Sequence, residues 1–179
     1  MTDRTLTTEP AEAPSRDHKL VAHLLRLRAN PAARAELRRG DTPALEARAL
    51  PYLDVWRLNE FQVKPALLFA AALTRFDSIP DVADRSLGAA AYATLSGVDR
   101  HDPSTSAVGR RVLAAQRQTL PLAHRTFTGL LTAVAAQPGH GLDWQRLWRS
   151  YQGWDHRDLN AQRRTRQRLL LDFYGSSGG

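Results

Sequence analysis

The sequence contains no cysteine and only two lysines, Lys19 and Lys64. The lack of cysteine excludes disulfide bonds and thiolate metal sites, and it suits a reducing cytoplasm, where we expect the protein to act. No stretch approaches the roughly 18–20 consecutive apolar residues that a membrane-spanning helix needs, so we expect no membrane partner. With 179 residues, the chain can bury a core without covalent crosslinks.

Catalytic patterns are lacking as well. There is no P-loop, no GxGxxG and no HExxH, and no two of the six histidines lie four residues apart. A metal-dependent nuclease needs clustered carboxylates. The C-terminal part of the chain has only four, and they are scattered: Asp143, Asp155, Asp158 and Asp172. We therefore expect no catalytic residue, no metal site and no cofactor.

Alanine, leucine and arginine dominate, all of them good helix formers, and no run alternates apolar and polar residues as a strand does. The sequence predicts an all-α protein of two small helical bundles packed together, with no sheet. The stretch SGVDRHDPSTS is rich in Gly, Pro, Ser and Asp and marks a boundary between them. The expected divisions are a disordered leader at 1–17, an N-terminal bundle at 18–98, a linker at 99–106, a C-terminal bundle at 107–175 and a flexible tail at 176–179.

Helical spacing and turn residues place the individual helices. We expect helices at 16–29, from Pro31 towards Gly40, from Pro43, from Pro51, from Pro65, and at 82–95, 107–118, 122–137, 143–153 and 158–174.

The charge is unevenly distributed. Residues 1–102 contain 14 lysines and arginines and 14 acids, whereas residues 103–179 contain 11 arginines and four aspartates. Arginine forks onto phosphate oxygens, so this excess predicts contact with a polyanion. The alternative for any single arginine is an ordinary solvated helix face.

The helix expected at 158–174 carries the strongest part of this signal, because residues 159–171 contain no acid at all. On a helical wheel, Leu159, Leu169, Leu170 and Phe173 fall on one side, and Arg164 and Arg168 fall on the opposite side. Arg163 flanks the apolar side. Arg166 points along it, which is odd for a core position unless this end of the helix extends beyond the bundle.

Aromatic residues recur at spacings of four, three and three: Trp144, Trp148, Tyr151 and Trp154. Exposed aromatics can stack on unpaired bases. A stripe at helical spacing is more often core, so we predict that these four are buried, and we predict the same of Trp56 and Phe61.

Several stretches together resemble one family. They are ELRRG (36–40), RSLGAAAY (85–92), GRRVLAAQRQ (109–118), LAHRTFTGLL (122–131), LDWQRLWRSYQGW (142–154) and RTRQRLLLDFYG (164–175). Their order and approximate spacing over residues 18–175 are similar to those of the CasB family, the small subunit of the type I-E CRISPR surveillance complex Cascade. The most specific part is LDW followed ten residues later by a tryptophan and then by the basic helix.

The resemblance implies an all-helical, non-catalytic scaffold subunit, present as a pair with other Cascade subunits. Such a subunit contacts the backbones of guide RNA and of target and non-target DNA and helps to hold the displaced strand, while base pairing reads the sequence. The basic positions carried over from the family, with Arg168 added from the wheel, are Arg38, Arg39, Arg110, Arg111, Arg117, Arg125, Arg163, Arg164, Arg166 and Arg168. One departure is that Ala89 and Ala90 stand where the family often has a basic residue, which Arg85 could replace.

Two other functions remain open from the sequence. The chain could be a structural adaptor whose arginines meet acidic protein partners, and competition by DNA or RNA would distinguish this. It could also be a helical DNA-binding regulator. A regulator, however, presents base-reading Asn and Gln to the major groove, whereas the basic helices here offer mainly arginine.

Overall fold

The structure, a computed structural model, describes residues 15–54 and 56–176. Within these residues the chain is all-helical and has no strand, and its β-type pairing is limited to an isolated parallel bridge between Asp81 and Leu142. The helices are α1 (Arg16–Leu27), α2 (Pro31–Leu37), the 3-10 helix η1 (Pro43–Leu45), α3 (Glu46–Ala49), α4 (Pro51–Asp54), α5 (Glu60–Arg75), α6 (Leu87–Ala93), α7 (Ala107–Ala115), α8 (Leu120–Ala135), α9 (Trp144–Gly153) and α10 (Leu159–Gly175). The all-α fold predicted from the sequence is confirmed.

Most helices begin where a short polar side chain can accept hydrogen bonds from the free N–H groups of the first turn. Asp143 accepts from the Arg146 N–H at the start of α9, and Asp158 accepts from the Asn160 N–H at the start of α10. Two of the few acids in the C-terminal part of the chain are therefore used as helix caps.

Helix α5 begins earlier than the sequence predicted. The Asn59 side chain accepts from the N–H groups of Phe61 and Gln62, and the Gln62 side chain accepts from the Asn59 N–H. This capping box satisfies the free donors of the first turn, so the helix starts at Glu60 and Pro65 lies inside it. The predicted start at Pro65 was wrong because the capping residues precede the proline.

Helix α6 is shorter than the predicted helix at 82–95. The segment before it pairs with residue 142 instead: the Val82 N–H donates to the Leu142 carbonyl, and the Leu142 N–H donates to the Pro80 carbonyl, both at 3.0 Å. These backbone bonds hold the segment next to the start of α9. Ser86 then caps α6 by accepting from the Ala89 N–H.

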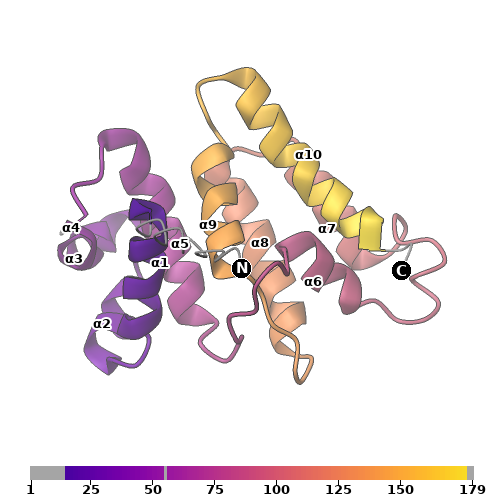
Figure 1. Cartoon of the computed structure of the whole chain (residues 1–179), viewed down its shortest axis with the longest axis horizontal. Coiled ribbons are helices and arrows are strands. Elements are labelled where there is room, and N and C mark those ends of the chain that lie inside the picture. Colours follow the sequence, from indigo (N-terminus) through magenta and orange to yellow (C-terminus); the bar gives the residue numbers. More distant parts are fainter. Residues whose placement is uncertain (1–14, 55, 177–179) are drawn as a thin grey trace, which may run out of the picture.

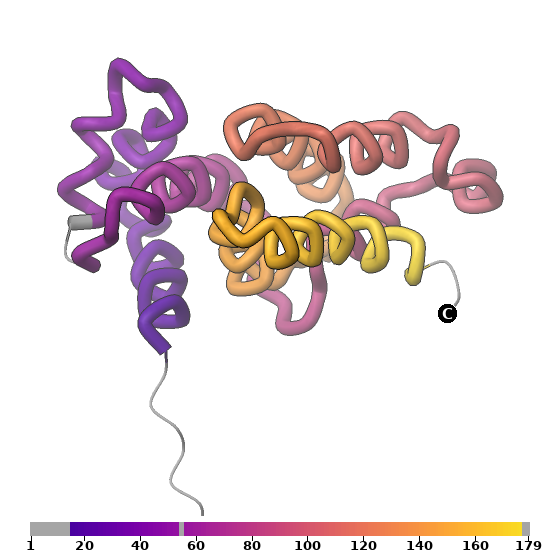
Figure 2. Tube along the Cα trace, turned by 90° about the horizontal axis from the view of Figure 1, so that it is seen from above, coloured from indigo at the N-terminus to yellow at the C-terminus, as the bar shows by residue number. Residues whose placement is uncertain are grey.

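The helices fall into two groups in space (Figure 1). Helices α1 to α5 form one group and α6 to α10 the other, with α9 packed against α5 and α1 where the groups meet. Helix α6 precedes the linker expected at 99–106, yet it packs mainly on α10 and also on α8 and α7. Packing therefore places α6 with the C-terminal helices. Seen from above, α7 and α10 run alongside each other in that group (Figure 2), and the two helices are in contact.

The expected ends of the chain are only partly visible. Residues 1–14 of the expected leader and 177–179 of the expected tail lie outside the described residues. Ser15 caps α1 and Asp17 lies in its first turn, where its carboxylate accepts from the side chains of Trp148 and Gln152. The ordered fold therefore includes residues 15–17.

The aromatic stripe of α9 joins the two groups of helices. Trp144, Trp148, Tyr151 and Trp154 are each 0% exposed, which confirms that they are core. Phe69 of α5 packs against the first three of them, with ring centroids 5.3–6.4 Å apart. Phe127 of α8 packs against Tyr151 and Trp154, at 5.5 and 4.8 Å. Burial of these large rings supplies much of the apolar contact between the groups.

Three apolar residues are less buried than predicted. Phe61 is 52% exposed, and the Arg157 guanidinium lies 3.5 Å from the centre of its ring. Leu159 is 70% exposed because it occupies the first turn of α10, before that helix reaches the core. Trp56 is half-buried and lies edge-on to His23. The predictions that Phe61 and Leu159 face the core were wrong.

A buried polar chain also crosses between the groups. The Tyr151 hydroxyl lies 2.8 Å from Nδ1 of His124, Nε2 of that ring lies 3.4 Å from Asp41 Oδ2, and Asp41 in turn accepts from Arg75 at 2.7 Å. Burial raises the pKa of Tyr151, so its hydroxyl remains protonated and can donate. Burial also lowers the pKa of His124, against the opposing effect of Asp41. The neutral ring therefore accepts from Tyr151 and donates to Asp41.

Candidate nucleic-acid interface

Helix α10 presents arginines to solvent along one face and leucine and phenylalanine to the core along another. Leu169 and Phe173 are buried, whereas Arg163, Arg164 and Arg168 are exposed. In the described part of the chain no carboxylate forms an ion pair with any of these three arginines. The helical wheel therefore placed Arg164 and Arg168 on the correct face.

Arg166 has a different environment. Its Nε donates to the Trp154 carbonyl at 3.1 Å, one terminal nitrogen donates to the Gln116 carbonyl at 3.0 Å, and the other donates to Asp155 at 3.0 Å. Its side chain is only 19% exposed. The sequence put Arg166 among the nucleic-acid contacts and suggested that its helix projects beyond the bundle. The structure instead turns it inward, where its donors tie α10 to α7 and α9.

A groove of about 470 Å³ lies between α9 and α10. Four arginines line it: Arg146 and Arg149 from α9, and Arg164 and Arg168 from α10. Helix α9 turns its aromatic stripe to the core, so its other positions face outward beside α10. The groove therefore concentrates positive charge from two helices in one place.

The sequence reasoning missed Arg146 and Arg149. Both occur in LDWQRLWRSYQGW, which was interpreted only through its aromatic residues. A signal was available: two arginines three residues apart, between tryptophans that face inward, must share an outward face of that helix. Arg149 is exposed, while Arg146 donates to the Asp84 carbonyl at 2.7 Å and lies 3.9 Å from Asp172.

The four aspartates of residues 103–179 all have structural partners. Asp143 and Asp158 cap helices, and Asp155 accepts from Arg166 and from the Leu120 N–H at the start of α8. Asp172 faces Arg146. The pKa of Asp158 is lowered, first by the hydrogen bond from the Asn160 N–H and to a smaller extent by the charge of Arg164. These acids leave most of the arginines in this part of the chain without a counter-charge.

A second set of arginines lies on α7, on α8 and in the turn between them. Arg110, Arg111, Arg117 and Arg125 are all exposed. Arg110 bonds locally to the Thr105 carbonyl, and Arg111 lies across α8 near Gly129. None of these four arginines lines the α9–α10 groove, so the structure does not gather all the predicted arginines at that groove.

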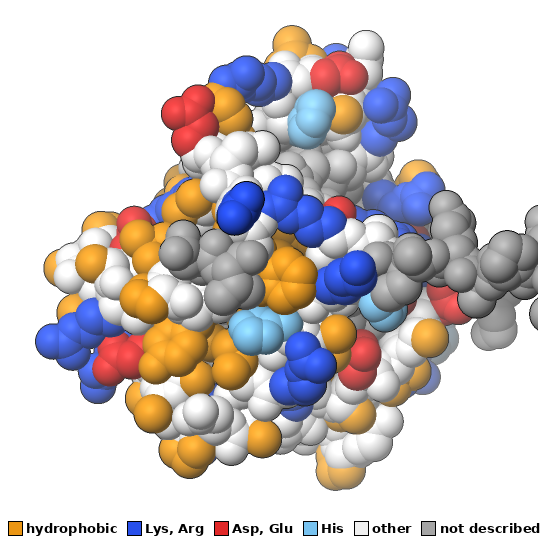
Figure 3. All heavy atoms as spheres, turned by 60° about the vertical axis from the view of Figure 1, so that its left-hand side comes forward, with side chains coloured by type: hydrophobic (Ala, Val, Ile, Leu, Met, Phe, Trp, Pro, Cys, Tyr) orange, Lys and Arg blue, Asp and Glu red, His pale blue; other side chains and the backbone are white. Residues whose placement is uncertain are grey.

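Arg38 and Arg39 belong to the N-terminal group of helices. Arg38 donates to the Thr74 carbonyl at 2.8 Å and to Asp77 at 3.3 Å, so it is largely used within the fold. Arg39 is exposed and lies 4.0 Å from Glu36. The face on this side of the molecule carries acidic and basic side chains interspersed (Figure 3). Neither arginine lines the α9–α10 groove.

Ala89 and Ala90, which stand where the CasB family often has a basic residue, lie on a tightly packed helix, α6. Ala90 is 0% exposed, and a Cβ at Gly88 would lie 2.6 Å from the Leu169 carbonyl oxygen of α10. Helix α6 therefore rests directly on the α10 backbone and leaves no room for a long side chain at position 90. Arg85, just before α6, is partly buried.

Neither a metal site nor a membrane-spanning helix is found in the described residues. No group of three or more His, Asp or Glu side chains in residues 15–54 and 56–176 could hold a metal ion. No helix in the same part of the chain is long and apolar enough to cross a membrane.

Comparison with known families gives a match over most of the chain. The family model for CRISPR-associated protein Cse2 matches residues 33–174. No curated protein sequence matches the chain.

Solved structures of similar fold agree with this match. A Cse2-family CRISPR-associated protein from Thermus thermophilus superposes with a TM-score of 0.69 and 22% identity, over 90% of this chain and 99% of that one. CasB of M. ruber gives a TM-score of 0.66 and 17% identity, over 92% and 95%. A chain of a CRISPR RNA-guided surveillance complex gives a TM-score of 0.58 and 26% identity, over 90% and 92%.

Proposed function

This chain belongs to the family of CRISPR-associated protein Cse2, and we propose that it is a non-catalytic subunit of a CRISPR RNA-guided surveillance complex of the Cascade type. In this proposal it assembles with the other Cascade subunits and with a second copy of itself, in the cytoplasm. Its exposed arginines contact the backbones of guide RNA and of target and non-target DNA. These contacts stabilise the opened DNA of the R-loop.

One observation carries the nucleic-acid part of the proposal: four arginines of α9 and α10 line the groove, and three of them lack a carboxylate partner within the described residues. Arg149, Arg164 and Arg168 have no carboxylate partner within the described residues. Of the four aspartates after residue 102, only Asp172 faces a groove arginine, Arg146. Unpaired guanidinium groups suit phosphate oxygens and cost little to expose in the free protein. The arginines give no reason to expect base reading, because phosphate contacts carry no sequence information.

The proposed contacts predict strong salt dependence. Each phosphate contact contributes about −0.7 to the slope of log K against log salt on a single strand and about −0.9 on a duplex. Four to six engaged arginines therefore give slopes of roughly −3 to −5. Fluorescence anisotropy with labelled oligonucleotides over a salt series measures this slope. A flat response, or a tenfold preference for one sequence over another of equal length, would contradict the proposal.

Competition and co-purification experiments separate the proposal from the two other functions. An adaptor for acidic proteins would lose no protein partner when DNA or RNA is added in excess. A regulator would discriminate between sequences. A surveillance-complex subunit should co-purify with tagged neighbouring subunits and guide RNA, and its binding to bare strands should be competed equally by strands of unrelated sequence.

A further inference from the structure

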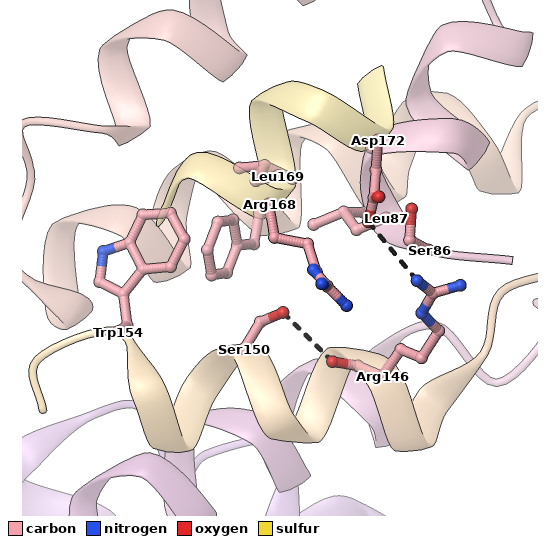
Figure 4. Close-up of a pocket in the computed structure, with 10 residues that line it drawn as sticks. Ser86, Leu87, Arg146, Ser150, Trp154, Arg168, Leu169 and Asp172 are labelled. Carbon is pink, nitrogen blue, oxygen red and sulfur yellow. Dashed lines mark hydrogen bonds and ion pairs between the residues drawn. The ribbon is translucent and has the colours of Figure 1, made fainter. Parts of the chain in front are cut away.

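The α9–α10 groove contains a specific meeting point of polar side chains. A small cavity of about 30 Å³ opens between α6, α9 and α10, and Arg146, Ser150, Arg168 and Asp172 are among the residues around it. Figure 4 shows the side chains of Arg146 and Arg168 reaching into the same space beside Ser150. A cavity of this size has room for one water molecule or one oxygen atom of a larger group.

The two arginines of this cavity retain donors that the fold does not use. Arg146 uses one terminal nitrogen on the Asp84 carbonyl, at 2.7 Å, and its other terminal nitrogen lies 3.9 Å from Asp172, too far for a hydrogen bond. Arg168 is exposed and makes no hydrogen bond or ion pair within the described part of the chain. The Asp172 carboxylate is too far away to form a hydrogen bond with Arg146, so an anion between the two guanidinium groups would be stabilised by both charges.

Ser150 adds a third polar group. Its hydroxyl donates to the Arg146 carbonyl at 3.2 Å, one turn back along α9. Such a bond within a helix is weak, and the hydroxyl can exchange it for a charged acceptor, which forms a stronger hydrogen bond. The site therefore offers donors from three side chains around a space the size of one oxygen atom.

We propose that Arg146, Ser150 and Arg168 form a binding site for one backbone phosphate of a single nucleic-acid strand lying along the α9–α10 groove, and that Asp172 competes with this phosphate for Arg146. This inference rests on the proposed function and deepens it. It assigns a site to Arg146 and Ser150, and it identifies a counter-charge within the chain that the ligand displaces.

An exposed apolar side chain on the wall of the groove favours a single strand over a duplex. The groove lies between two adjacent helices, and Leu171 on its wall is 70% exposed. An exposed apolar side chain beside phosphate-binding arginines suits the face of an unpaired base, which is accessible only in a single strand. Arg149 and Arg164 continue the positive charge along the groove beyond the cavity.

The test uses the full chain and a fluorescent 30-nucleotide oligodeoxythymidylate, with anisotropy measured over a salt series. Arg168→Ala should weaken binding roughly tenfold, as expected for one charged contact, and lower the salt slope by about 0.7. The matched control is Arg48→Ala, which removes the same charge from an exposed site on α3. It should change affinity less than about twofold, because a distant surface charge acts only through the screened field.

A second variant tests the competitor. Asp172→Asn removes the carboxylate that faces Arg146 and should tighten binding roughly threefold, because one competing charge is lost from a partly exposed site. Asp102→Asn changes the net charge equally at an exposed position outside the groove and should have a smaller effect. A thermal melt of each variant accompanies its titration, so that loss of fold is not mistaken for loss of binding.

The outcomes separate this inference from the proposed function. If the parent chain binds the oligonucleotide but Arg168→Ala behaves as Arg48→Ala does, the phosphate site is wrong and the proposed function stands. If Arg168→Ala weakens a 30-base-pair duplex as much as it weakens the single strand, the assignment to a single strand is wrong. If the parent chain binds no strand at low salt, the proposed function itself fails.

Discussion

Arg166 stabilises the fold because each side of its guanidinium meets a different part of the C-terminal group. Its three hydrogen bonds go to the carbonyls of Trp154 and Gln116 and to the carboxylate of Asp155. None of these acceptors is close to Arg166 in the helix, so a helical wheel could not reveal them. The sequence identified the arginine but not its partners.

Arg166→Ala should lower the free energy of unfolding by about 2–4 kcal/mol, because it leaves two half-buried carbonyls and one carboxylate without their donor. Arg163→Ala, three residues earlier on the exposed face, should change it by less than about 0.5 kcal/mol. Urea denaturation of the two variants measures the difference. Equal stabilities would show that the Arg166 bonds contribute nothing to the fold.

Trp148 tests the aromatic contact between the two groups of helices. Its ring is 0% exposed and lies 5.3 Å from that of Phe69, and its N–H donates to Asp17 of α1. Trp148→Ala should therefore cost about 3–5 kcal/mol of unfolding free energy. The check is a denaturant titration beside a binding curve. An unchanged transition midpoint with weakened binding would mean that the ring contacts bases and not the core.

At the level of elements, α6 packs on α10 with the two backbones in close contact at Gly88. A Cβ on Gly88 would lie 2.6 Å from the Leu169 carbonyl oxygen and 2.8 Å from the Phe173 nitrogen. Because both neighbours are backbone atoms of one helix, neither can move aside alone. The contact joins residues about eighty positions apart, which is why local patterns did not assign α6 to the C-terminal helices.

Gly88→Ala should therefore destabilise the protein by about 1–3 kcal/mol, since the extra methyl group must push α6 away from α10. Gly97→Ala is the matched control, because a Cβ there meets nothing within 4 Å. Thermal melts of the two variants measure the effect. If Gly88→Ala has the same melting temperature as Gly97→Ala, the backbones of α6 and α10 are not in close contact at Gly88.

Features that depend on local chemistry were predictable from the sequence, whereas features that depend on packing between distant helices were not. The caps at Asp143 and Asp158 and the buried stripe of α9 follow from local chemistry and helical spacing. Phe61 was predicted to be core because it is aromatic, but it lies in the first turn of α5, directly after the Asn59 cap, and is exposed there. Arg146 and Arg149 belong to the groove only because α10 packs beside α9, which no local pattern specifies.

At the level of the whole molecule, the chain of Asp41, His124 and Tyr151 connects the two groups of helices and makes their contact depend on pH. Burial is the largest influence on His124 and lowers its pKa below the ordinary 6.5. Burial alone would raise the pKa of Asp41, but its bonds with Arg75 and His124 outweigh that effect and lower it. The folded protein therefore favours neutral His124 and ionised Asp41.

The direction of the pH effect follows from proton uptake. As pH falls below about 6.5, the unfolded chain protonates His124 before the folded chain does, so the free energy of unfolding decreases. The stability that neutral His124 contributes to the folded protein is fully present above that pH. His124→Gln should remove this part of the dependence, which is measured as the difference between the two unfolding curves from pH 8 to pH 5. Parallel curves for the two proteins would show that His124 does not titrate differently in the folded state.

The central claim is that the unpaired arginines of α10 serve nucleic-acid binding and not folding. Its most direct test is the double variant Arg164→Ala with Arg168→Ala in a surveillance complex reconstituted with guide RNA, measured for retention of opened target DNA over a salt series and for its melting temperature alone. The melting temperature should stay almost unchanged, since both side chains are exposed. The complex should assemble but release opened DNA at lower salt, with the slope reduced by about 1.4 if each arginine meets one phosphate of a single strand. Retention equal to that of the parent would contradict the claim and leave this face of α10 as an ordinary solvated surface.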